Sequence, residues 1–386
     1  MKRINITLFT LMLLGILFSC TRASINYTQN GNWVSRATWP GLPMGYGVSF
    51  VIGTEAYVGL GINPVTPNQR ITAFWQYTAT PINNQEPTGY DSALGYWTQM
   101  APFIGPGRSN AVGFTIGGQG YAGSGIGNDG ITPLYDFYTY NYAGNSWARI
   151  ADFREPPPAG SPVGTLGDSL ARYDAVAWGF DTVGYVLTGY DNNYYYGDVW
   201  AYSPATGTWR PGVVCPGNPR SGAVTWVYNG KGYLVTGYTP GSVHANNNMA
   251  YDFWMYDPTQ ENNPTTGPWT RLHDIFNTNP ATFDDGYTNI VRQHGTGFTI
   301  LGTATGDKGY VTLGINGTSL QYTWEYDFAS DLWTEKTPYK NAGRGGAFGF
   351  TLDNRGFVGA GLALGNSQAF ADVEEFFPNM VYNQYD

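Results

Sequence analysis

The chain has 386 residues, which is long for one ordinary domain but suits a single large array of repeats. Charged residues make up only 12%, against about 25% in typical globular proteins, whereas glycine occurs 53 times and aromatic residues reach 16%. This composition favours sheets and turns over helices. The formal net charge is −9 and the chain has no run of Lys or Arg, which argues against nucleic acid as a partner.

The N-terminus is typical of a targeting segment. Lys2 and Arg3 form a short basic region, and Leu8–Phe18 is an apolar run too short to span a bilayer as a structural helix. The run ends in Leu-Phe-Ser-Cys, which resembles the lipobox of bacterial lipoproteins. The resemblance implies that residues 1–19 are a signal peptide and that Cys20 carries the lipid. The alternative is a signal that is cleaved without lipidation.

Residues 20–30 are predicted to be the lipidated cysteine and a polar tether, with lipid chains that hold the protein on a membrane without spanning it. Residues 21–24 lack the acidic run that resembles a surface-export signal, which favours the periplasmic side of the outer membrane. The only other cysteine is Cys215. If Cys20 is acylated, no intrachain disulfide can form, so Cys215 is predicted to be a small apolar core residue.

The stretch from Arg108 to Trp147 is one supersecondary unit, and the chain repeats it. An apolar alternation over 111–116, a Gly-Tyr segment over 120–125 and an aromatic segment over 136–140 predict three short strands. A Gly-Asn turn then leads into a fourth strand. Because a small antiparallel meander of this kind cannot bury its faces alone, the copies must stack on one another.

Three landmarks recur along the chain. Tryptophans beside turns stand 50 to 64 residues apart, at Trp33, Trp97, Trp147, Trp209, Trp269 and Trp333. A run of the type Arg-x-x-Ala-Val-x-aromatic precedes each Gly-Tyr segment, and the first copy has Met44 in place of the arginine. A strand of the type Asp-aromatic-Trp-x-Tyr is clearest over 198–202 and 252–256. Six copies of each landmark predict six propeller blades.

The two ends of the repeat array complement each other. The last copy lacks its terminal strand with the turn and tryptophan, whereas the first copy is preceded by a spare one over 30–35. We therefore predict that the N-terminal strand completes the sixth blade. This closure would remove the open sheet edges.

These repeats resemble those of the kelch superfamily of six-bladed β-propellers, and most of all the kelch-type lipoproteins of Bacteroidetes-like bacteria. The resemblance covers residues 31–386 and implies an all-β fold of four-stranded antiparallel blades. It has one departure. Where kelch repeats have paired glycines, this chain has pairs such as Ser124-Gly125 and Thr236-Gly237.

Five arginines stand at equivalent positions in the repeats, ahead of the strand that lines the channel of a propeller. Five guanidiniums around one mouth predict an anion-attracting site, because the arginine fork matches carboxylates. In eukaryotic kelch adaptors, similar arginines grip acidic peptide segments. The alternative is that each arginine hydrogen-bonds neighbouring carbonyls or a nearby aspartate. The binding candidates are Arg108, Arg172, Arg220, Arg292 and Arg344.

His294 follows Arg292 and is predicted to lie at the channel as a sixth binding candidate. Together with His244 and His273 it does not make the convergent ligand set that a metal needs, so we predict no metal and no cofactor. The loops at 191–196 and 239–248 are rich in Tyr or Asn. Their side chains could stack on sugars and bind hydroxyls, or they could simply form turns.

No nucleophile–base pair, phosphate loop or pair of catalytic carboxylates stands out in the sequence. We therefore predict a non-enzymatic scaffold in the bacterial cell envelope that binds a protein or a glycan, as a monomeric propeller or as a subunit of a complex. The alternative follows from the kelch resemblance. It is a carbohydrate-active enzyme, similar to a sialic acid epimerase or mutarotase, that would use His294 and the arginines on a carboxylated sugar.

Overall fold

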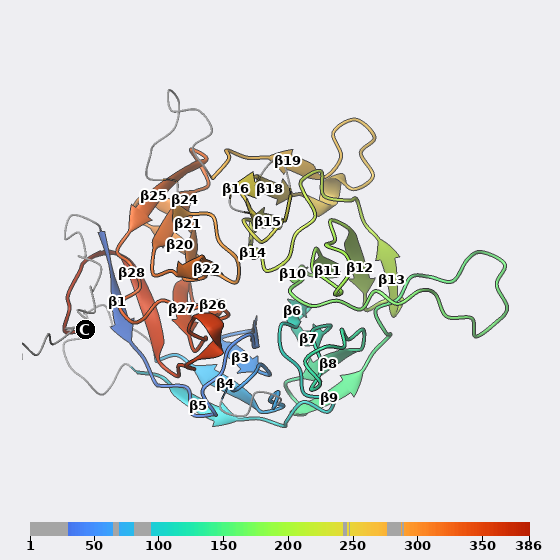
Figure 1. Ribbon diagram of the computed structural model, residues 1–386, viewed down its shortest axis with the longest axis horizontal. Helices are drawn as coiled ribbons and strands as arrows, with labels where there is room; N and C mark the ends of the chain where they lie inside the picture. Colours follow the sequence, from blue (N-terminus) through green and yellow to red (C-terminus); the bar gives the residue numbers. More distant parts are fainter. Residues whose placement is uncertain are drawn as a thin grey trace, which may run out of the picture.

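The structure is a computed structural model that describes residues 30–64, 69–80, 94–241, 245–246, 248–275, 287 and 289–386. The predicted signal peptide, Cys20 and His244 lie outside the described residues, so the predictions on them stay predictions. The described residues form six four-stranded antiparallel sheets around one axis (Figure 1). The all-β propeller of six blades that the repeats predict is therefore confirmed.

The first three blades follow the chain from inside to outside. Blade one comprises β2 (Val48–Ile52), β3 (Glu55–Gly59), β4 (Phe74–Thr78) and β5 (Tyr96–Gln99). Blade two comprises β6 (Val112–Ile116), β7 (Gln119–Gly123), β8 (Phe137–Asn141) and β9 (Ser146–Arg149). Blade three comprises β10 (Val176–Gly179), β11 (Gly184–Leu187), β12 (Val199–Ser203) and β13 (Thr208–Pro211).

The other three blades carry the additional elements and the closure. Blade four comprises β14 (Val224–Tyr228), β15 (Lys231–Val235), β18 (Phe253–Tyr256) and β19 (Trp269–Arg271), with the small hairpin β16 (Ala245–Asn246) and β17 (Met249–Ala250). Blade five comprises β20 (Thr296–Thr303), β21 (Gly306–Thr312), β24 (Thr323–Asp327) and β25 (Leu332–Lys336), with the hairpin β22 (Ile315–Asn316) and β23 (Thr318–Ser319). Blade six comprises β26 (Phe348–Leu352), β27 (Arg355–Gly359), β28 (Val373–Val381) and β1 (Asn30–Ser35).

The N-terminal strand completes blade six, as predicted. β1 pairs antiparallel with β28, with Trp33 opposite Phe376, and Figure 1 shows the two strands side by side. Just beyond β1, Arg36 Nε lies 2.6 Å from a Glu375 carboxylate oxygen, and both side chains are almost fully buried. Two short 3-10 helices are described, η1 (Pro258–Gln260) and η3 (Leu364–Asn366). Within the described residues, no helix is long and apolar enough to cross a membrane.

A ring of backbone hydrogen bonds joins all six blades at the axis. In each blade, one residue donates its backbone N–H to the carbonyl of its counterpart in the preceding blade, over 2.7–3.0 Å. This residue stands two positions after the recurrent arginine, or after Met44 in blade one. All of these residues have φ between 53° and 63°. We call this set the axial ring, and its members are Tyr46, Asn110, Asp174, Gly222, His294 and Gly346.

A second set of inter-blade hydrogen bonds explains the departure from paired glycines. The N–H of Gly125, for example, donates to the carbonyl of Arg172 in the next blade over 2.8 Å, and the other five blades repeat this bond. The residue before each of these glycines is not glycine, yet its φ lies between 56° and 61°. The closed ring therefore holds six residues in a left-handed conformation that ordinary side chains avoid. They are Leu60, Ser124, Thr188, Thr236, Leu313 and Ala360.

The Gly-Tyr landmark has a packing reason. A Cβ atom at Gly120 would lie 2.2 Å from the ring of Phe50 in the preceding blade, and one at Gly184 would lie 2.2 Å from the ring of Phe114. The glycine therefore allows an aromatic ring on the first strand of one blade to pack directly against the second strand of the next. The sandwiched rings form the core between blades.

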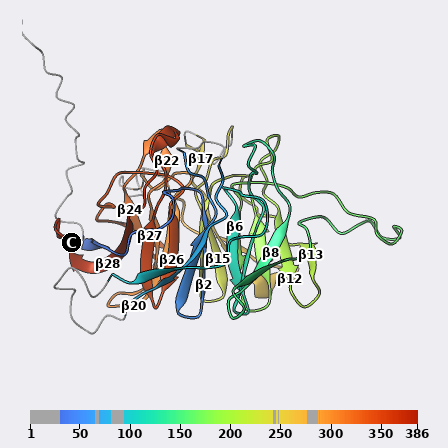
Figure 2. The ribbon, with the colours of Figure 1, turned by 90° about the horizontal axis from the view of Figure 1, so that it is seen from below.

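The two faces of the disc differ. Strands alternate in direction, so the loops between second and third strands share one face with the connections between blades. This face carries β17 and β22, at the top of Figure 2, and we call it the upper face. Below it the innermost strands approach closely: Thr115 Oγ1 donates to the carbonyl of Val51 over 2.7 Å, and a Cβ atom at Gly179 would lie 2.0 Å from the carbonyl oxygen of Thr115. The candidate functional groups described below lie on the upper face.

Candidate functional site

The five predicted arginines are buried, and their guanidiniums do not face an open mouth. Each residue is at most 1% exposed. Arg108 holds Asp136 through two hydrogen bonds of 2.9 and 2.7 Å, and Arg220 holds Asp252 through bonds of 2.6 and 2.7 Å. Blades three and six repeat the pair with Arg172–Asp198 and Arg344–Asp372. These contacts are those of the structural alternative, and we call each pair an Arg–Asp pin.

The pin joins two of the sequence landmarks. Its aspartate stands 26 to 32 residues after the arginine and opens the third strand of the blade. The arginine also donates to the carbonyls at the upper ends of the same blade, for example from Arg108 to Ser124 and Asp136. Most donors of a pinned arginine are therefore engaged inside its own blade, and its guanidinium is buried.

Blade five is the exception among the blades that have the arginine. Among the described residues, Arg292 contacts no carboxylate and donates to main-chain carbonyls, those of Leu313 and Tyr322 at 2.6 and 2.9 Å among them. Tyr322 occupies the position of the pin aspartate. Burial lowers the pKa of Arg292 to about 9, and the charge of Glu335 opposes this shift.

The side chains of the axial ring form a polar chain across the upper face. Asn110 Nδ2 donates to Asp174 Oδ1 over 2.6 Å, and His294 Nε2 lies 3.1 Å from Asp174 Oδ2. The ring of Tyr46 meets the imidazole edge-on at 5.0 Å between centroids. The structure therefore places His294 at the axis, in the turn before β20 and paired with a carboxylate from blade three.

Two glycines in the axial ring make room for this chain. A Cβ atom at Gly222 would lie 2.7 Å from His294 Cδ2, and one at Gly346 would lie 2.6 Å from the ring of Tyr46. The imidazole and the phenol therefore lie over the backbone of the neighbouring blade. This arrangement brings His294 within reach of Asp174.

Charge and burial act against each other in the pair of Asp174 and His294. Burial alone would lower the pKa of His294, but the carboxylate of Asp174 outweighs it and the pKa is raised. Burial alone would raise the pKa of Asp174, but the nearby charge of His294 and the hydrogen bond from Asn110 leave it lowered. Both shifts favour the ion pair.

Four tyrosines lie beside the axial ring on blades three and four. Tyr190 stacks on Tyr195 with 4.4 Å between ring centroids, Tyr173 meets Tyr190 edge-on at 5.6 Å, and Tyr195 contacts Tyr238 at 5.8 Å. We call these four residues the tyrosine row. All four are partly exposed. The charge of Asp174 contributes, after burial, to the raised pKa of both Tyr173 and Tyr195, so the row is close to the axial ring.

The loop at 191–196 forms a turn and also presents an aromatic side chain, the two features that its sequence predicts. The carboxylate of Asp191 accepts the backbone N–H groups of Asn193 and Tyr194 over 2.8 and 2.7 Å, which is turn chemistry. The same turn presents Tyr195 to the tyrosine row. We call the tyrosine row together with the axial side chains of Tyr46, Asn110, Asp174 and His294 the central site.

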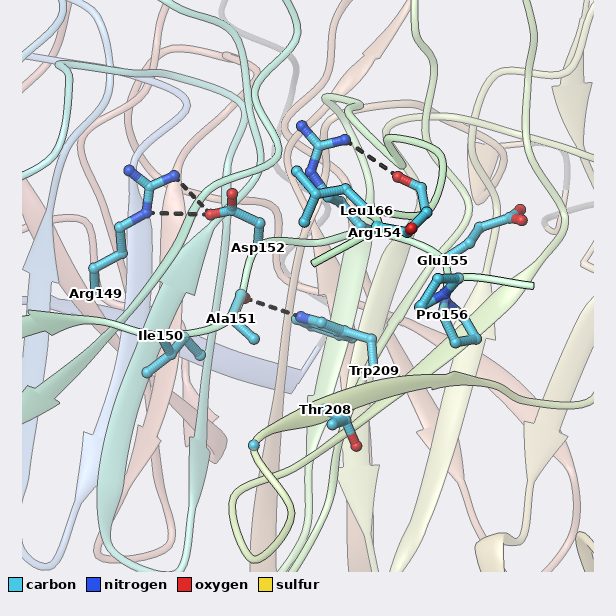
Figure 3. Close-up of a pocket in the computed structure, with 14 residues that line it drawn as sticks. Arg149, Ile150, Ala151, Asp152, Arg154, Glu155, Pro156, Leu166, Thr208 and Trp209 are labelled. Atoms are coloured by element: carbon cyan, nitrogen blue, oxygen red, sulfur yellow. Dashed lines mark hydrogen bonds and ion pairs between the residues drawn. The ribbon is translucent and has the colours of Figure 1, made fainter. Parts of the chain in front are cut away.

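A separate pocket of about 490 Å³ lies between the outermost strands of blades two and three (Figure 3). Its polar groups bind one another. Arg149 Nη2 lies 2.6 Å from Asp152 Oδ1, Trp209 Nε1 donates to the carbonyl of Ala151 over 3.2 Å, and Arg154 donates to a carbonyl of the connection at 154–169. The contacts hold this connection against the blades, and we assign the pocket no ligand.

The remaining candidates lie apart from the central site. His273 pairs with Asp331 at the surface over 2.7 Å, and Cys215 is a free thiol, 5% exposed, in the core between blades three and four. Burial raises the pKa of Cys215 to about 11. Within the described ranges, no group of three or more His, Cys, Asp or Glu side chains is placed to hold a metal ion.

Comparisons with known proteins agree with the fold. No family model matches the chain. Over 138 residues it is 31% identical to the N-acetylneuraminate epimerase of Vibrio vulnificus (strain YJ016), which is 34% of this chain and only 29% of that relative's length. The solved structure of YjhT superposes with a TM-score of 0.61 at 16% identity, covering 88% of this chain and 95% of that one. At this identity the likeness shows the fold alone, a kelch-type β-propeller.

Proposed function

We propose that this kelch-type propeller is a non-enzymatic scaffold that binds a glycan of the cell envelope at the central site. The observation that carries the proposal is the tyrosine row beside the Asn110–Asp174 pair. Tyrosine rings stack on the C–H faces of sugars, while carboxylate and amide groups accept and donate hydrogen bonds to hydroxyls. A protein partner from the envelope is the other occupant that we consider.

The geometry supports binding by a preorganised surface. The backbone of the axial residues is held by the closed ring of hydrogen bonds, which restrains the positions of Asp174 and His294. A rigid site loses little conformational freedom on binding. Rigid aromatic side chains likewise cost little entropy for the area they offer.

A matched pair of variants tests this site. A glycan array of envelope oligosaccharides identifies a probe, whose affinity is then measured by calorimetry. We expect Tyr195→Ala to weaken binding about tenfold, since one aromatic stacking contact is worth roughly 1–3 kcal/mol. Tyr195→Phe, which keeps the ring, should bind nearly as well as the wild type. The control is Tyr385→Ala at an exposed residue near the C-terminus. Equal affinity of Tyr195→Ala and wild type would contradict the proposal.

We also propose that Cys20 anchors the protein to the outer membrane on its periplasmic side. The basic region, the apolar run and the terminal cysteine support this placement. Cys20→Ser should move the protein from the membrane fraction to the soluble periplasmic fraction, and mass spectrometry of the N-terminal peptide should lose the lipid mass. An unmodified N-terminal peptide in the wild type would refute lipidation.

A second candidate function is anomer exchange of N-acetylneuraminate. The partial similarity to an N-acetylneuraminate epimerase favours it, and an imidazole held by a carboxylate is a common acid–base arrangement. Exchange between the anomers can be followed by NMR in the presence of wild type and of His294→Ala. Acceleration by the wild type that is lost in His294→Ala would support an enzyme. No acceleration by the wild type would exclude this reaction.

A further inference from the structure

We propose that Arg70, a residue the repeats did not single out, binds an oxyanion at the edge of the central site. The ligand would then carry a carboxylate, sulfate or phosphate group. This inference rests on the proposed function, because it names the chemical class of ligand for the same face. Arg70 belongs to the loop between the second and third strands of blade one and pairs there with Ile62.

Hydrogen bonds connect Arg70 to the central site. Arg70 Nε donates to Ser109 Oγ over 3.0 Å, and the next residue, Asn110, donates to Asp174 over 2.6 Å. The backbone N–H of Arg70 donates to Asn128 Oδ1 over 3.2 Å, which ties the loop of blade one to that of blade two. Arg70 is therefore one end of a hydrogen-bonded arc, and the tyrosine row begins at the other end with Tyr173.

The charge of Arg70 is not matched by a contact. Its Nη1 atom is shielded from solvent, and among the described residues it has neither a hydrogen-bond acceptor nor a carboxylate within ion-pair distance. The charge of Asp129 reaches it through space, but the carboxylate of Asp129 already accepts the N–H groups of Ile131 and Thr132 over 3.0 and 2.9 Å and the hydroxyl of Thr132. Nη1 is shielded from a ligand as well as from water, so an oxyanion would bind the part of the guanidinium that faces solvent.

The comparison with the pinned arginines sharpens this assignment. Four of them pair with an aspartate of their own blade, and Arg292 donates its hydrogen bonds to main-chain carbonyls. Arg70 has a donor left and is partly exposed on the upper face. Its planar fork suits an oxyanion, whereas an ammonium group would be repelled.

The test uses two sugars that differ only in the anionic group. Glucuronate and glucose are titrated into the full-length protein, and binding is followed by NMR. We expect the wild type to prefer glucuronate about tenfold, as a charge-assisted hydrogen bond would give. Arg70→Gln should abolish the preference without weakening glucose, and Arg70→Lys should retain part of it. The control is Arg149→Gln, which removes an exposed arginine of the outer pocket.

Inorganic sulfate provides the arm that does not depend on sugar binding. Sulfate stabilises folded proteins generally, so we expect it to raise the melting temperature of the wild type and of Arg149→Gln more than that of Arg70→Gln. If both sugars bind equally well to the wild type, the proposed function stands and the anion site is overturned. A third outcome is that neither sugar binds, while sulfate raises the melting temperature of proteins that retain Arg70 more than that of Arg70→Gln. This result would support the anion site and contradict glycan binding. Equal stabilisation of Arg70→Gln and wild type by sulfate would overturn the inference.

Discussion

Blades one and five both depart from the Arg–Asp pin, and they do so in opposite ways. Blade one has exchanged both partners, with Met44 in the position of the arginine and Ala73 in that of the aspartate. Blade five has kept Arg292 and exchanged only the aspartate, for Tyr322. Blade one therefore has an apolar pair, with Met44 buried and Ala73 partly buried, whereas blade five buries a charge that no described carboxylate contacts.

The difference shows what the pin contributes. Replacing both members of a buried ion pair by apolar groups is often neutral, whereas removing one member leaves an uncompensated charge in a medium of low dielectric. Blade five limits that cost by surrounding Arg292 with carbonyl oxygens, which accept four hydrogen bonds from it. The blades thus close their upper ends in three ways: with an Arg–Asp pin, with the apolar pair Met44 and Ala73, or with an arginine bound to main-chain carbonyls.

The largest effect should come from breaking a complete pin. Asp252→Ala in blade four leaves the guanidinium of Arg220 buried without its carboxylate, since both side chains are fully buried in the wild type. We expect a loss of about 3–5 kcal/mol in the free energy of unfolding. The measurement is the midpoint of urea unfolding.

The matched control is Asp152→Ala, which removes the partner of an exposed arginine in the outer pocket. Exposed ion pairs contribute little, so its unfolding midpoint should stay at the wild-type value. Equal destabilisation by Asp152→Ala and Asp252→Ala would show that burial does not decide the cost.

The next largest effect is a rescue that copies blade one into blade four. Arg220→Met combined with Asp252→Ala removes both charges together. We expect the double variant to recover most of the stability that Asp252→Ala loses, to within about 1–2 kcal/mol of the wild type. A double variant as unstable as the sum of the two single variants would mean that the two residues do not act as a pair.

The architecture could be predicted because it repeats. The tryptophans, the Gly-Tyr segments and the spare strand at 30–35 each report a packing requirement that every blade shares, such as the contact between Gly120 and Phe50. Requirements that recur six times leave a pattern in the sequence. The predicted strands of blade two accordingly lie within a few residues of those in the structure.

The site could be predicted only in part, for the same reason. Four of the five arginines contact an aspartate of their own blade and all five are buried, so their recurrence has a structural reason. Asn110, Asp174 and Tyr46 were missed, since their position holds a different residue in each blade. The sequence signal that could have found these residues is their equivalent position in each repeat, two residues after the recurrent arginine. His294 was found because histidine is rare in this chain.

A smaller effect should follow from placing a carboxylate at the pin position of blade five. Tyr322→Asp supplies a partner to Arg292, and Tyr322→Asn removes the same ring without supplying a charge. At pH 7 we expect the Asp variant to be more stable than the Asn variant by about 1–2 kcal/mol, as measured by urea unfolding.

The pH dependence of that difference identifies its cause. In the wild-type pin of blade two, burial raises the pKa of Asp136, but Arg108 outweighs it and the pKa is lowered. A carboxylate with a lowered pKa stabilises the fold above its ordinary pKa of about 3.9 and loses this effect as the pH falls through the folded-state value. The advantage of Tyr322→Asp should therefore disappear in acid. A difference that persists at pH 2 would argue for packing instead of charge.

The smallest effect concerns the ion pair between Asp174 and His294 at the axis. The pins lie within single blades, whereas His294 of blade five takes its partner, Asp174, from blade three. Because the pKa of His294 is raised, its pairing stabilises the fold fully below the ordinary pKa of about 6.5 and less as the pH rises through the folded-state value. We expect the wild type to lose on the order of 1 kcal/mol over that window. Asp174→Asn should flatten the dependence and bring the imidazole titration, followed by NMR, back toward its ordinary value. Tyr46, Tyr173 and Tyr195 also face this pair, but their raised pKa values keep them neutral across the same range. An unchanged His294 titration in Asp174→Asn would mean that the axial pair does not link the two blades.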